Sequence, residues 1–584
     1  MKEKFKSWAF SKEHGKCDVI TLIIYLLGVC TVSFFHEPWF DEAQAWAIAR
    51  SGTIKEILFE IPHYEGHPPL WHLILVPFAK LGAPYELSLA AVNIFFMTLA
   101  VAVLLFKSPF PKLIRCLLPF NFFLFYQYGV ISRPYCILVL AIFLAAVCYK
   151  NRNEHPVKYL LCLALMCAVH SYGIMIAGCL CIVWLIEIFT EYKKSGKLAD
   201  ILKDRRCWLM FCLLIFAMLV MAAIVPDENV YLGGKMSNET EKKFDFSCIN
   251  ILFCFVIFSD SIITSFFNYA GVPSEIASQI PVIVVSILLV ALFVTITYRN
   301  KKLLTFLLPY GVLSIFGSFV YISPHHIGVI TAFVIFVLWI IVDENGKVLL
   351  PEYMNKISAK IGKKLKVILK AIAFLPLLIP IAWSCTSSYF DIRYPYWFDE
   401  AADFIKEYHL DDYKIIGYWQ QVLNGEIDDD AFWNVDEADY MWHDYPNLQG
   451  ISVALNPYFD KNIFCYFNID KHDKTYFDKN IFCYFNIDKH DKTFQYYRAN
   501  TQKEAEEEFS KWREQGEPDV VIERCEITKA YPDIDVDNYV AVKRIYFYKP
   551  YKFETYDQYI TIYVTKDLFN KIGTLEELTA KKLY

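Results

Sequence analysis

Four short polar clusters interrupt the apolar runs of this 584-residue chain, and they contain the residue types that could do chemistry. In the first cluster, Asp41 and Glu42 stand side by side directly after an apolar run. A carboxylate here could act as a general base, but acidic residues also stabilise the first turn of a helix through its dipole. Neighbouring residues on a helix point about 100° apart. We therefore expect one of the two carboxylates to face a reaction centre and the other to bind a neighbouring helix.

The second cluster, residues 62–72, combines histidines with a glutamate in a turn that contains Gly66, Pro68 and Pro69. Glycine and proline prevent a regular helix, so a defined turn must position the side chains. Glu65 and His67 are candidate ligands for a divalent ion such as Mg, Mn or Zn, because carboxylate and imidazole both bind such ions. His63 and Tyr64 are further site candidates. The alternative is a polar loop that leads into an amphipathic surface helix over 70–81.

The third and fourth clusters supply a cation and more histidines. Arg133 is the only basic residue in the turn 131–134. A guanidinium binds phosphate through two parallel charge-assisted hydrogen bonds, although an interfacial Arg can also reach toward lipid headgroups. The fourth cluster comprises His170, His325 and His326, each at the boundary of an apolar run.

The elements that must position these residues are apolar helices. Apolar residues make up 56% of the chain and charged residues 21%, against about 45–50% and about 25% in soluble domains. The excess lies before residue 390, which excludes a soluble enzyme, a disordered protein and a fibrous one. The net charge of −6 argues against a nucleic-acid partner.

A membrane span needs about 20 apolar residues. The runs long enough predict eleven transmembrane helices, at 19–35, 85–106, 113–130, 135–149, 158–172, 173–190, 207–225, 279–297, 303–322, 327–342 and 367–385. No cleavage site follows 19–35, so we interpret that run as a span and not a signal peptide. Segment 247–269 is predicted to be re-entrant or to lie along the outer surface.

The positive charges predict the orientation of these spans. The segments assigned to the inside hold 26 Lys and Arg, and the outside segments before residue 386 hold seven. Cytoplasmic loops are enriched in Lys and Arg, so we expect residues 1–18 to be cytoplasmic. Residues 19–385 then form the transmembrane domain, and its outer loop 36–84 carries the first two clusters. All four clusters fall on the outer side.

Residues 386–584 differ in composition from the rest and are predicted to form an extracytoplasmic α/β domain. Strand-like pieces at 414–418, 520–523, 539–548 and 559–564 alternate with helical patterns at 398–408 and 501–514. Residues 458–475 and 476–493 are identical 18-residue copies in tandem. Two perfect copies indicate a recent local duplication or an assembly error in the sequence, so we assign them no function.

The order of Asp41-Glu42, Tyr64-Glu65-Gly66-His67-Pro68-Pro69-Leu70 and Ser132-Arg133-Pro134-Tyr135 resembles that in the GT-C class of membrane glycosyltransferases. Within that class the chain is most similar to the protein O-mannosyltransferase and aminoarabinose transferase group. The resemblance covers residues 20–345 and implies an all-α polytopic GT-C-like fold with its site at the outer membrane face. It also implies roles for three residues: Asp41 as catalytic base or acceptor-side carboxylate, Glu65 as metal ligand and Arg133 beside the donor phosphate.

The expected function is therefore inverting transfer of a sugar from a polyprenyl-phosphate donor to an extracytoplasmic glycan, lipid or protein. The lipid bilayer is the expected surrounding, and a bacterial cell membrane is favoured because the tail does not look like the sugar-binding module of the eukaryotic mannosyltransferases. Two alternatives stay open: a transporter or flippase of lipid-linked sugars, and a non-catalytic membrane scaffold. Transporters usually show internal pseudo-symmetry, which the hydropathy of this chain lacks.

Overall fold

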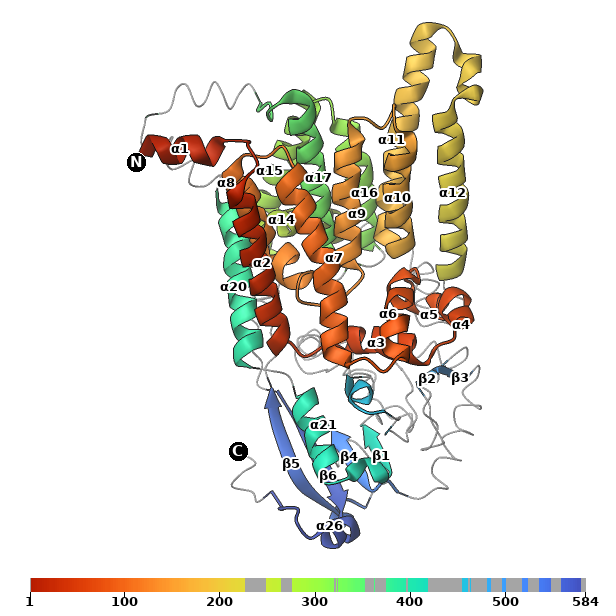
Figure 1. Ribbon diagram of the computed structural model, residues 1–584, viewed down its shortest axis with the longest axis vertical. Coiled ribbons are helices and arrows are strands. Elements are labelled where there is room, and N and C mark those ends of the chain that lie inside the picture. Colours follow the sequence, from red (N-terminus) through yellow and green to blue (C-terminus); the bar gives the residue numbers. More distant parts are fainter. Residues whose placement is uncertain are drawn as a thin grey trace.

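The computed structural model (Figure 1) places a helical bundle at one end and a small sheet at the other. It describes residues 2–225, 248–263, 276–319, 322, 324–351, 362, 374–394, 397–417, 454–460, 463, 481–484, 496–499, 517–523, 535–547 and 558–578.

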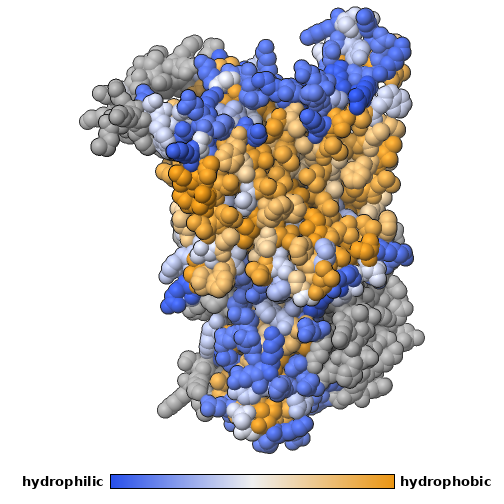
Figure 2. Space-filling model, in the orientation of Figure 1, coloured by the Kyte–Doolittle hydropathy of each residue, from blue (hydrophilic) through white to orange (hydrophobic). Residues whose placement is uncertain are grey.

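Six helices within the described residues are long and apolar enough to cross a membrane. They are α2 (Lys16–Phe35), α7 (Tyr85–Lys107), α11 (Ser171–Ser195), α12 (Arg205–Ile224), α15 (Ile276–Arg299) and α17 (Ile327–Asn345). Figure 2 shows the resulting apolar band around the bundle, with hydrophilic residues beyond both of its edges. A helix suits this environment because it satisfies its own backbone hydrogen bonds where no water is present. The chain is therefore a mostly helical membrane protein.

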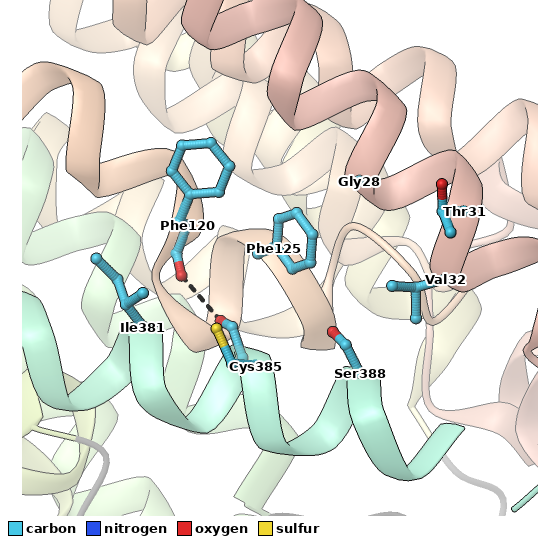
Figure 3. A pocket seen from close by; sticks show the side chains of 9 residues that line it. Gly28, Thr31, Val32, Phe120, Phe125, Ile381, Cys385 and Ser388 are labelled. Atoms are coloured by element: carbon cyan, nitrogen blue, oxygen red, sulfur yellow. Dashed lines mark hydrogen bonds between the residues drawn. The ribbon is translucent and has the colours of Figure 1, made fainter. Parts of the chain in front are cut away.

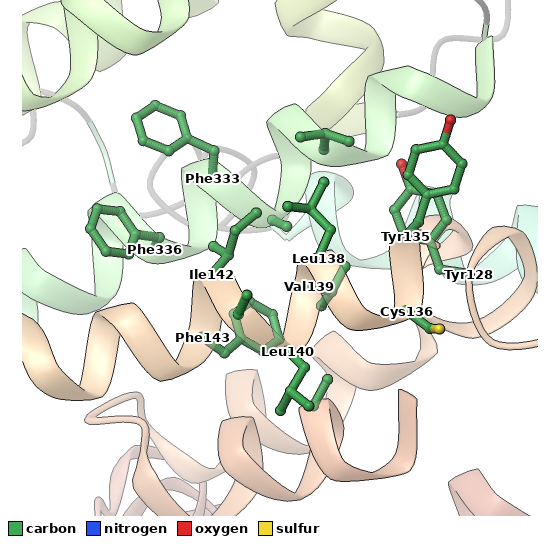
Figure 4. Close-up of a cluster of buried hydrophobic side chains, with 14 of the residues drawn as sticks. Tyr128, Tyr135, Cys136, Leu138, Val139, Leu140, Ile142, Phe143, Phe333 and Phe336 are labelled. Atoms are coloured by element: carbon green, nitrogen blue, oxygen red, sulfur yellow. The ribbon is translucent and has the colours of Figure 1, made fainter. Parts of the chain in front are cut away.

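Shorter helices complete the bundle: α9 (Tyr135–Tyr149), α10 (Pro156–Val169), α14 (Cys248–Ile263), α16 (Leu303–Phe319) and α20 (Leu375–Arg393). Helix α9 is apolar on all sides and lies at the centre, in contact with α7, α10 and α17. Figure 4 shows its side chains packed against Phe333 and Phe336 of α17. A helix that is hydrophobic all round must be buried in this way.

The predicted span 113–130 is wrong as a continuous helix. The chain instead forms α8 (Lys112–Leu117), a 3-10 turn η1 (Leu118–Phe120) and a π-helical turn η2 (Phe123–Gln127). Pro119 has no N–H to continue the helix. The side chain of Asn121 then accepts a hydrogen bond from the Phe123 N–H at 3.0 Å, which competes with helical bonding. The chain therefore reaches Arg133 through short turns and not through one continuous helix.

Two other boundaries also differ from the expectation. The chain breaks at His170, between α10 and α11, and not at residue 172, because the His170 ring accepts a hydrogen bond from the Tyr172 N–H and caps α11. Helix α20 continues to Arg393, beyond the predicted end at residue 385. With 113–130 broken and several helices shorter than 18 residues, the structure does not confirm eleven spans.

Of the two positions predicted for segment 247–269, the one along the outer surface is wrong, and the re-entrant one stays a prediction. Helix α14 contacts α15, α16, α17 and α20, and Ile257 and Phe258 are fully buried. Thr331 of α17 donates a hydrogen bond to the Ser261 carbonyl at 2.6 Å. The described part of the segment, α14, therefore packs inside the bundle.

The two ends of the bundle have different structures. At the end that carries α1 (Lys2–Phe10) and η3 (Leu198–Lys203), Arg115 forms a fully buried ion pair with Asp18, with an Nε–Oδ1 distance of 2.7 Å. The end nearest the sheet carries α3 (Phe40–Ser51), α4 (Ile54–Phe59), α5 (Pro62–Glu65) and α6 (Leu70–Lys80). Helix α6 confirms the predicted helix over 70–81.

The residues after α20 build a second, separate core around a four-stranded sheet. The strand order is β1 (Ile415–Gly417), β4 (Val520–Glu523), β6 (Gln558–Thr565), β5 (Tyr539–Phe547); β1 and β4 are parallel and the other pairs antiparallel. Helix α21 (Phe398–Glu407) packs its apolar face on this sheet, and α26 (Lys566–Ile572) follows β6. The four predicted strands and the helix at 398–408 are confirmed. The predicted helix at 501–514 lies outside the described residues.

The duplicated copies have different surroundings where the structure describes them. In the first copy, the Tyr458 hydroxyl hydrogen-bonds Glu86 of α7, and the Phe459 carbonyl accepts a hydrogen bond from Arg50 of α3 at 2.9 Å. In the second copy, β2 (Ile481–Tyr484) pairs antiparallel with β3 (Tyr496–Ala499). The first copy thus joins the bundle to the sheet.

Candidate active site at the sheet end of the bundle

Helix α3 presents its two acidic residues in different directions. Glu42 is fully buried and accepts hydrogen bonds from the backbone N–H of Trp39 at 2.8 Å and from that of Ser132. It also contacts the His36 ring, with Nε2 3.0 Å from Oε2. Glu42 therefore holds the start of α3 against the loop before α9, as expected for a carboxylate that binds its neighbours.

Asp41 faces the cation that the sequence singled out. Its Oδ2 lies 2.8 Å from Nη1 of Arg133, and the two side chains are 38% and 14% exposed. An ion pair with this exposure contributes little to stability, about 0–1 kcal/mol. Both groups can therefore exchange this contact for a ligand at small cost in folding free energy.

Asp41 and Arg133 line a small pocket. The other lining residues are Trp39, Glu42, Gln127, Ile131, Tyr135 and His325. Its volume is about 10 Å³, close to the space that one water molecule requires. A ligand of the size of a sugar phosphate is larger than this pocket.

Histidines from three elements meet beside this pocket. The ring centroids of His67 and His170 are 4.7 Å apart, those of His170 and His326 6.0 Å, and those of His325 and His326 4.2 Å. Desolvation and the Arg133 charge lower the pKa of His67 to about 3. Burial, with smaller contributions from the charges of His67 and Arg133, lowers the pKa of His170 well below its usual value. Neutral imidazoles are the form that binds metals and accepts hydrogen bonds.

One observation fits a metal ligand at His67. Within the described part of the chain, the buried atoms His67 Nδ1 and His170 Nε2 have no hydrogen-bond partner. The described residues contain no group of three or more His, Cys, Asp or Glu side chains that could hold a metal ion. The side chains of Glu65 and Tyr64 lie outside the described part of the chain. The structure thus offers an available nitrogen at His67 and leaves the predicted partner Glu65 untested.

His63 does not join the site. Its Nδ1 lies 2.7 Å from the carbonyl oxygen of Val225, at the end of α12. Of the predicted site residues, the structure brings together Asp41, Glu42, His67, Arg133, His170, His325 and His326.

The backbone near the pocket is held by three distant side chains. Asn93 of α7 donates to the carbonyls of Tyr128 and Gly129, both at 3.0 Å. Tyr25 of α2 donates to the Leu124 carbonyl at 2.8 Å. The Tyr128 hydroxyl in turn donates to the His325 carbonyl at 2.7 Å. Through these bonds α2, α7 and η4 (Pro324–His326) position the segment that carries Arg133.

A larger apolar cavity of about 360 Å³ lies between α2, the broken segment and α20 (Figure 3). Gly28, Phe125 and Cys385 line it, and Ser384 donates to the Phe120 carbonyl at 2.8 Å across it. It holds none of the charged groups of the smaller pocket.

Two residues beside the site were missed by the sequence reasoning: His36 and Asp391. The Nδ1 atom of His36 lies 3.0 Å from Oδ2 of Asp391 on α20. Both residues stand at helix ends next to apolar runs, which is the signal that marked the other clusters. Because the last span was predicted at 367–385, Asp391 fell in the predicted C-terminal domain and was not among the site candidates.

Comparisons of the chain with protein-family models, with curated proteins and with solved structures find no match. The resemblance to GT-C enzymes therefore depends on the residues quoted above.

Proposed function

We propose that this protein is a membrane glycosyltransferase of the GT-C type that moves a sugar from a polyprenyl-phosphate donor to an acceptor hydroxyl on a glycan, lipid or protein. The observation that supports this best is the Asp41–Arg133 pair, which lines a pocket at one end of the apolar bundle. A polyprenyl chain stays in the bilayer because each buried methylene contributes about 0.8 kcal/mol. An enzyme that uses such a donor needs its charged groups at the membrane boundary.

The pair supplies the two charges that the transfer needs. When the donor phosphate enters, it competes with Asp41 for the Arg133 guanidinium, which then stabilises the negative charge of the departing phosphate. Asp41, released from Arg133, accepts the proton of the acceptor hydroxyl as it attacks the anomeric carbon. The bond between that carbon and the phosphate oxygen breaks on the opposite side, so the sugar carbon inverts and polyprenyl phosphate leaves.

A divalent ion is a further part of the proposal. Glu65 and His67 would hold it, and when bound it would add positive charge beside the donor phosphate. The unpartnered Nδ1 atom of His67 supports this assignment.

The proposed topology follows the charge pattern. Residues 1–18 face the cytoplasm, up to eleven segments cross a bacterial cell membrane, and residues 386–584 lie outside as an α/β domain beside the acceptor. The position of α1 and of the sheet at opposite ends of the bundle supports this arrangement.

The test is transfer by purified protein in lipid vesicles with a panel of polyprenyl-phosphate sugars, comparing wild type with Asp41→Asn. Loss of a general base lowers turnover by about 10²–10⁴-fold, while the melting temperature should stay within a few degrees. Asp200→Asn is the matched control, since it removes an exposed ion pair with Lys203, far from the pocket. Turnover by Asp41→Asn close to that of wild type would refute the role of Asp41.

The same vesicles separate the alternatives. Movement of the labelled donor lipid to the other leaflet without sugar transfer would identify a flippase. Neither movement nor transfer with any donor of the panel would favour a scaffold.

A further inference from the structure

His36 lies between two carboxylates that come from different helices. It follows α2 directly, with Nε2 3.0 Å from Glu42 Oε2 on α3 and Nδ1 3.0 Å from Asp391 Oδ2 on α20. The three residues are buried, with 7%, 0% and 2% of their surface exposed. One imidazole ring therefore joins three helices at the edge of the candidate site.

The geometry determines which ring atoms carry protons. A neutral imidazole has one N–H and one lone pair, so one of its nitrogens would place a lone pair against a carboxylate oxygen. Glu42 also accepts hydrogen bonds from the backbone N–H groups of Trp39 and Ser132, so both of its carboxyl oxygens already face donors. Both ring nitrogens of His36 can donate only if the ring is an imidazolium.

The charges around His36 favour the same state. Burial alone would lower its pKa, but the Asp391 and Glu42 carboxylates raise the pKa well above its ordinary value. The other titratable or charged groups on the elements around it are Glu37, the next residue, Glu86 of α7, and the Asp41–Arg133 pair beyond Glu42. The two glutamates do not oppose the positive charge, and the charge of Arg133 is paired with Asp41.

We propose that His36 is a positioning residue that stays protonated and clamps the start of α3 between α2 and α20, so that Asp41 stays opposite Arg133. Glu42 is the link: its bond to His36 orients the first turn of α3, and Asp41 is its neighbour in that turn. The catalytic consequence rests on the proposed transferase function; the protonation state does not.

The first experiment measures the protonation state without any substrate. Histidine-selective 15N labelling of the full chain in nanodiscs gives signals from 13 histidines, and their comparison with His36→Gln assigns His36. We expect two protonated ring nitrogens at neutral pH, persisting into the alkaline range. A neutral ring at pH 7 would overturn the proposal, whatever the protein catalyses.

The second experiment uses the pH dependence of transfer. A raised pKa means that the clamp is complete at low pH and is lost as the pH rises through the pKa of His36 in the folded protein. Asp391→Asn removes one of the two carboxylates, so the alkaline decline in turnover should move down by at least about one pH unit. Glu400→Gln, which breaks an exposed ion pair with Lys543 in the sheet domain, should leave the profile unchanged.

The two experiments distinguish failure of the clamp from failure of the proposed transferase function. An unchanged pH profile in Asp391→Asn would show that Asp391 has only a structural role, and it would overturn the clamp. Absence of transfer by wild type with a doubly protonated His36 would refute the proposed function and leave the imidazolium clamp standing.

Discussion

At Arg133, substitution can separate the charge of the guanidinium from its shape. Arg133→Lys keeps the charge and loses the planar, bidentate geometry, and Arg133→Gln loses both. A hydrogen bond to a charged group contributes about 1.5–3 kcal/mol. We therefore expect KM for the donor to rise roughly 10–100-fold in Arg133→Gln and less in Arg133→Lys, as measured by initial rates in vesicles.

The control for this series is Arg206→Gln, at the other end of the bundle, where Arg206 pairs with Asp204 and Glu191. Its KM should match that of wild type. Equal KM values for Arg133→Gln and wild type would contradict a phosphate role for Arg133.

Single residues of the candidate site were accessible from the sequence. Position at the end of an apolar run selected Asp41, Arg133 and His170, and the grouping of histidines with a glutamate in residues 62–72 selected His67. The division of roles between Asp41 and Glu42 followed from helix geometry. The partners of Glu42 could not be predicted, because Ser132 and His36 reach it only after three separate helices have packed.

At the scale of elements, α17 packs closely against the broken segment at Gly328. A Cβ atom added at Gly328 would lie 2.5 Å from both the Phe123 ring and the Tyr128 hydroxyl. These atoms must move in Gly328→Ala, and the Tyr128 bond to the His325 carbonyl moves with them. Overpacking of this kind costs about 1–3 kcal/mol, so the melting temperature in detergent should fall.

Gly311→Ala is the matched control, because it also adds one methyl group to a helix and meets no atom within 4 Å. Ala is a better helix former than Gly by about 1 kcal/mol, so the stability of this variant should be unchanged or higher. Equal destabilisation of both variants would contradict the close contact at Gly328.

Element positions were predicted best where apolar runs are long and uninterrupted, as in α2, α7 and α9. The break at 118–127 was missed because the residues on both sides of it and within it are apolar. Pro119 and Asn121 were the residues that could have indicated the break. The burial of α14 could not be predicted, because the count of Lys and Arg in the loops indicates only on which side of the membrane a loop lies.

At the scale of the whole molecule, the joint between bundle and sheet contains a buried acid. Oε2 of Glu37 accepts a hydrogen bond from the Phe398 N–H at 3.0 Å and caps α21. Burial and the neighbouring Asp399 raise the pKa of Glu37 from 4.5 to about 9. The contribution of Glu37 to the stability of the joint is therefore fully present below about pH 4.5 and is lost as the pH rises toward 9.

We expect the free energy of unfolding to fall by roughly 2–4 kcal/mol between pH 5 and pH 8 through this group. Glu37→Gln, which resembles the neutral acid, should flatten that part of the pH dependence in thermal unfolding. Wild type and Glu37→Gln with parallel pH profiles would contradict a neutral Glu37.

The duplication makes a further prediction about the joint. Deleting either 18-residue copy produces the same protein, in which Asn456 and Pro457 still precede the sequence that begins with Tyr458. Because the contacts to Glu86 and Arg50 come from this first copy, the deletion should leave the domain contact intact. Limited proteolysis that separates the sheet domain from the bundle should proceed at the wild-type rate, whereas Tyr458→Ala should accelerate it.

The sequence by itself determined that the chain is a helical membrane protein, that its polar clusters stand at the ends of apolar runs, and that four strands follow the last helix. Composition and periodicity are local properties, and they suffice for these features. Only the tertiary structure decided that Asp41 pairs with Arg133, that Glu42 is buried and hydrogen-bonds neighbouring elements, and that His36 lies between two carboxylates. These contacts join residues up to 355 positions apart. They depend on which helices pack against one another, and helices of similar composition do not specify this locally.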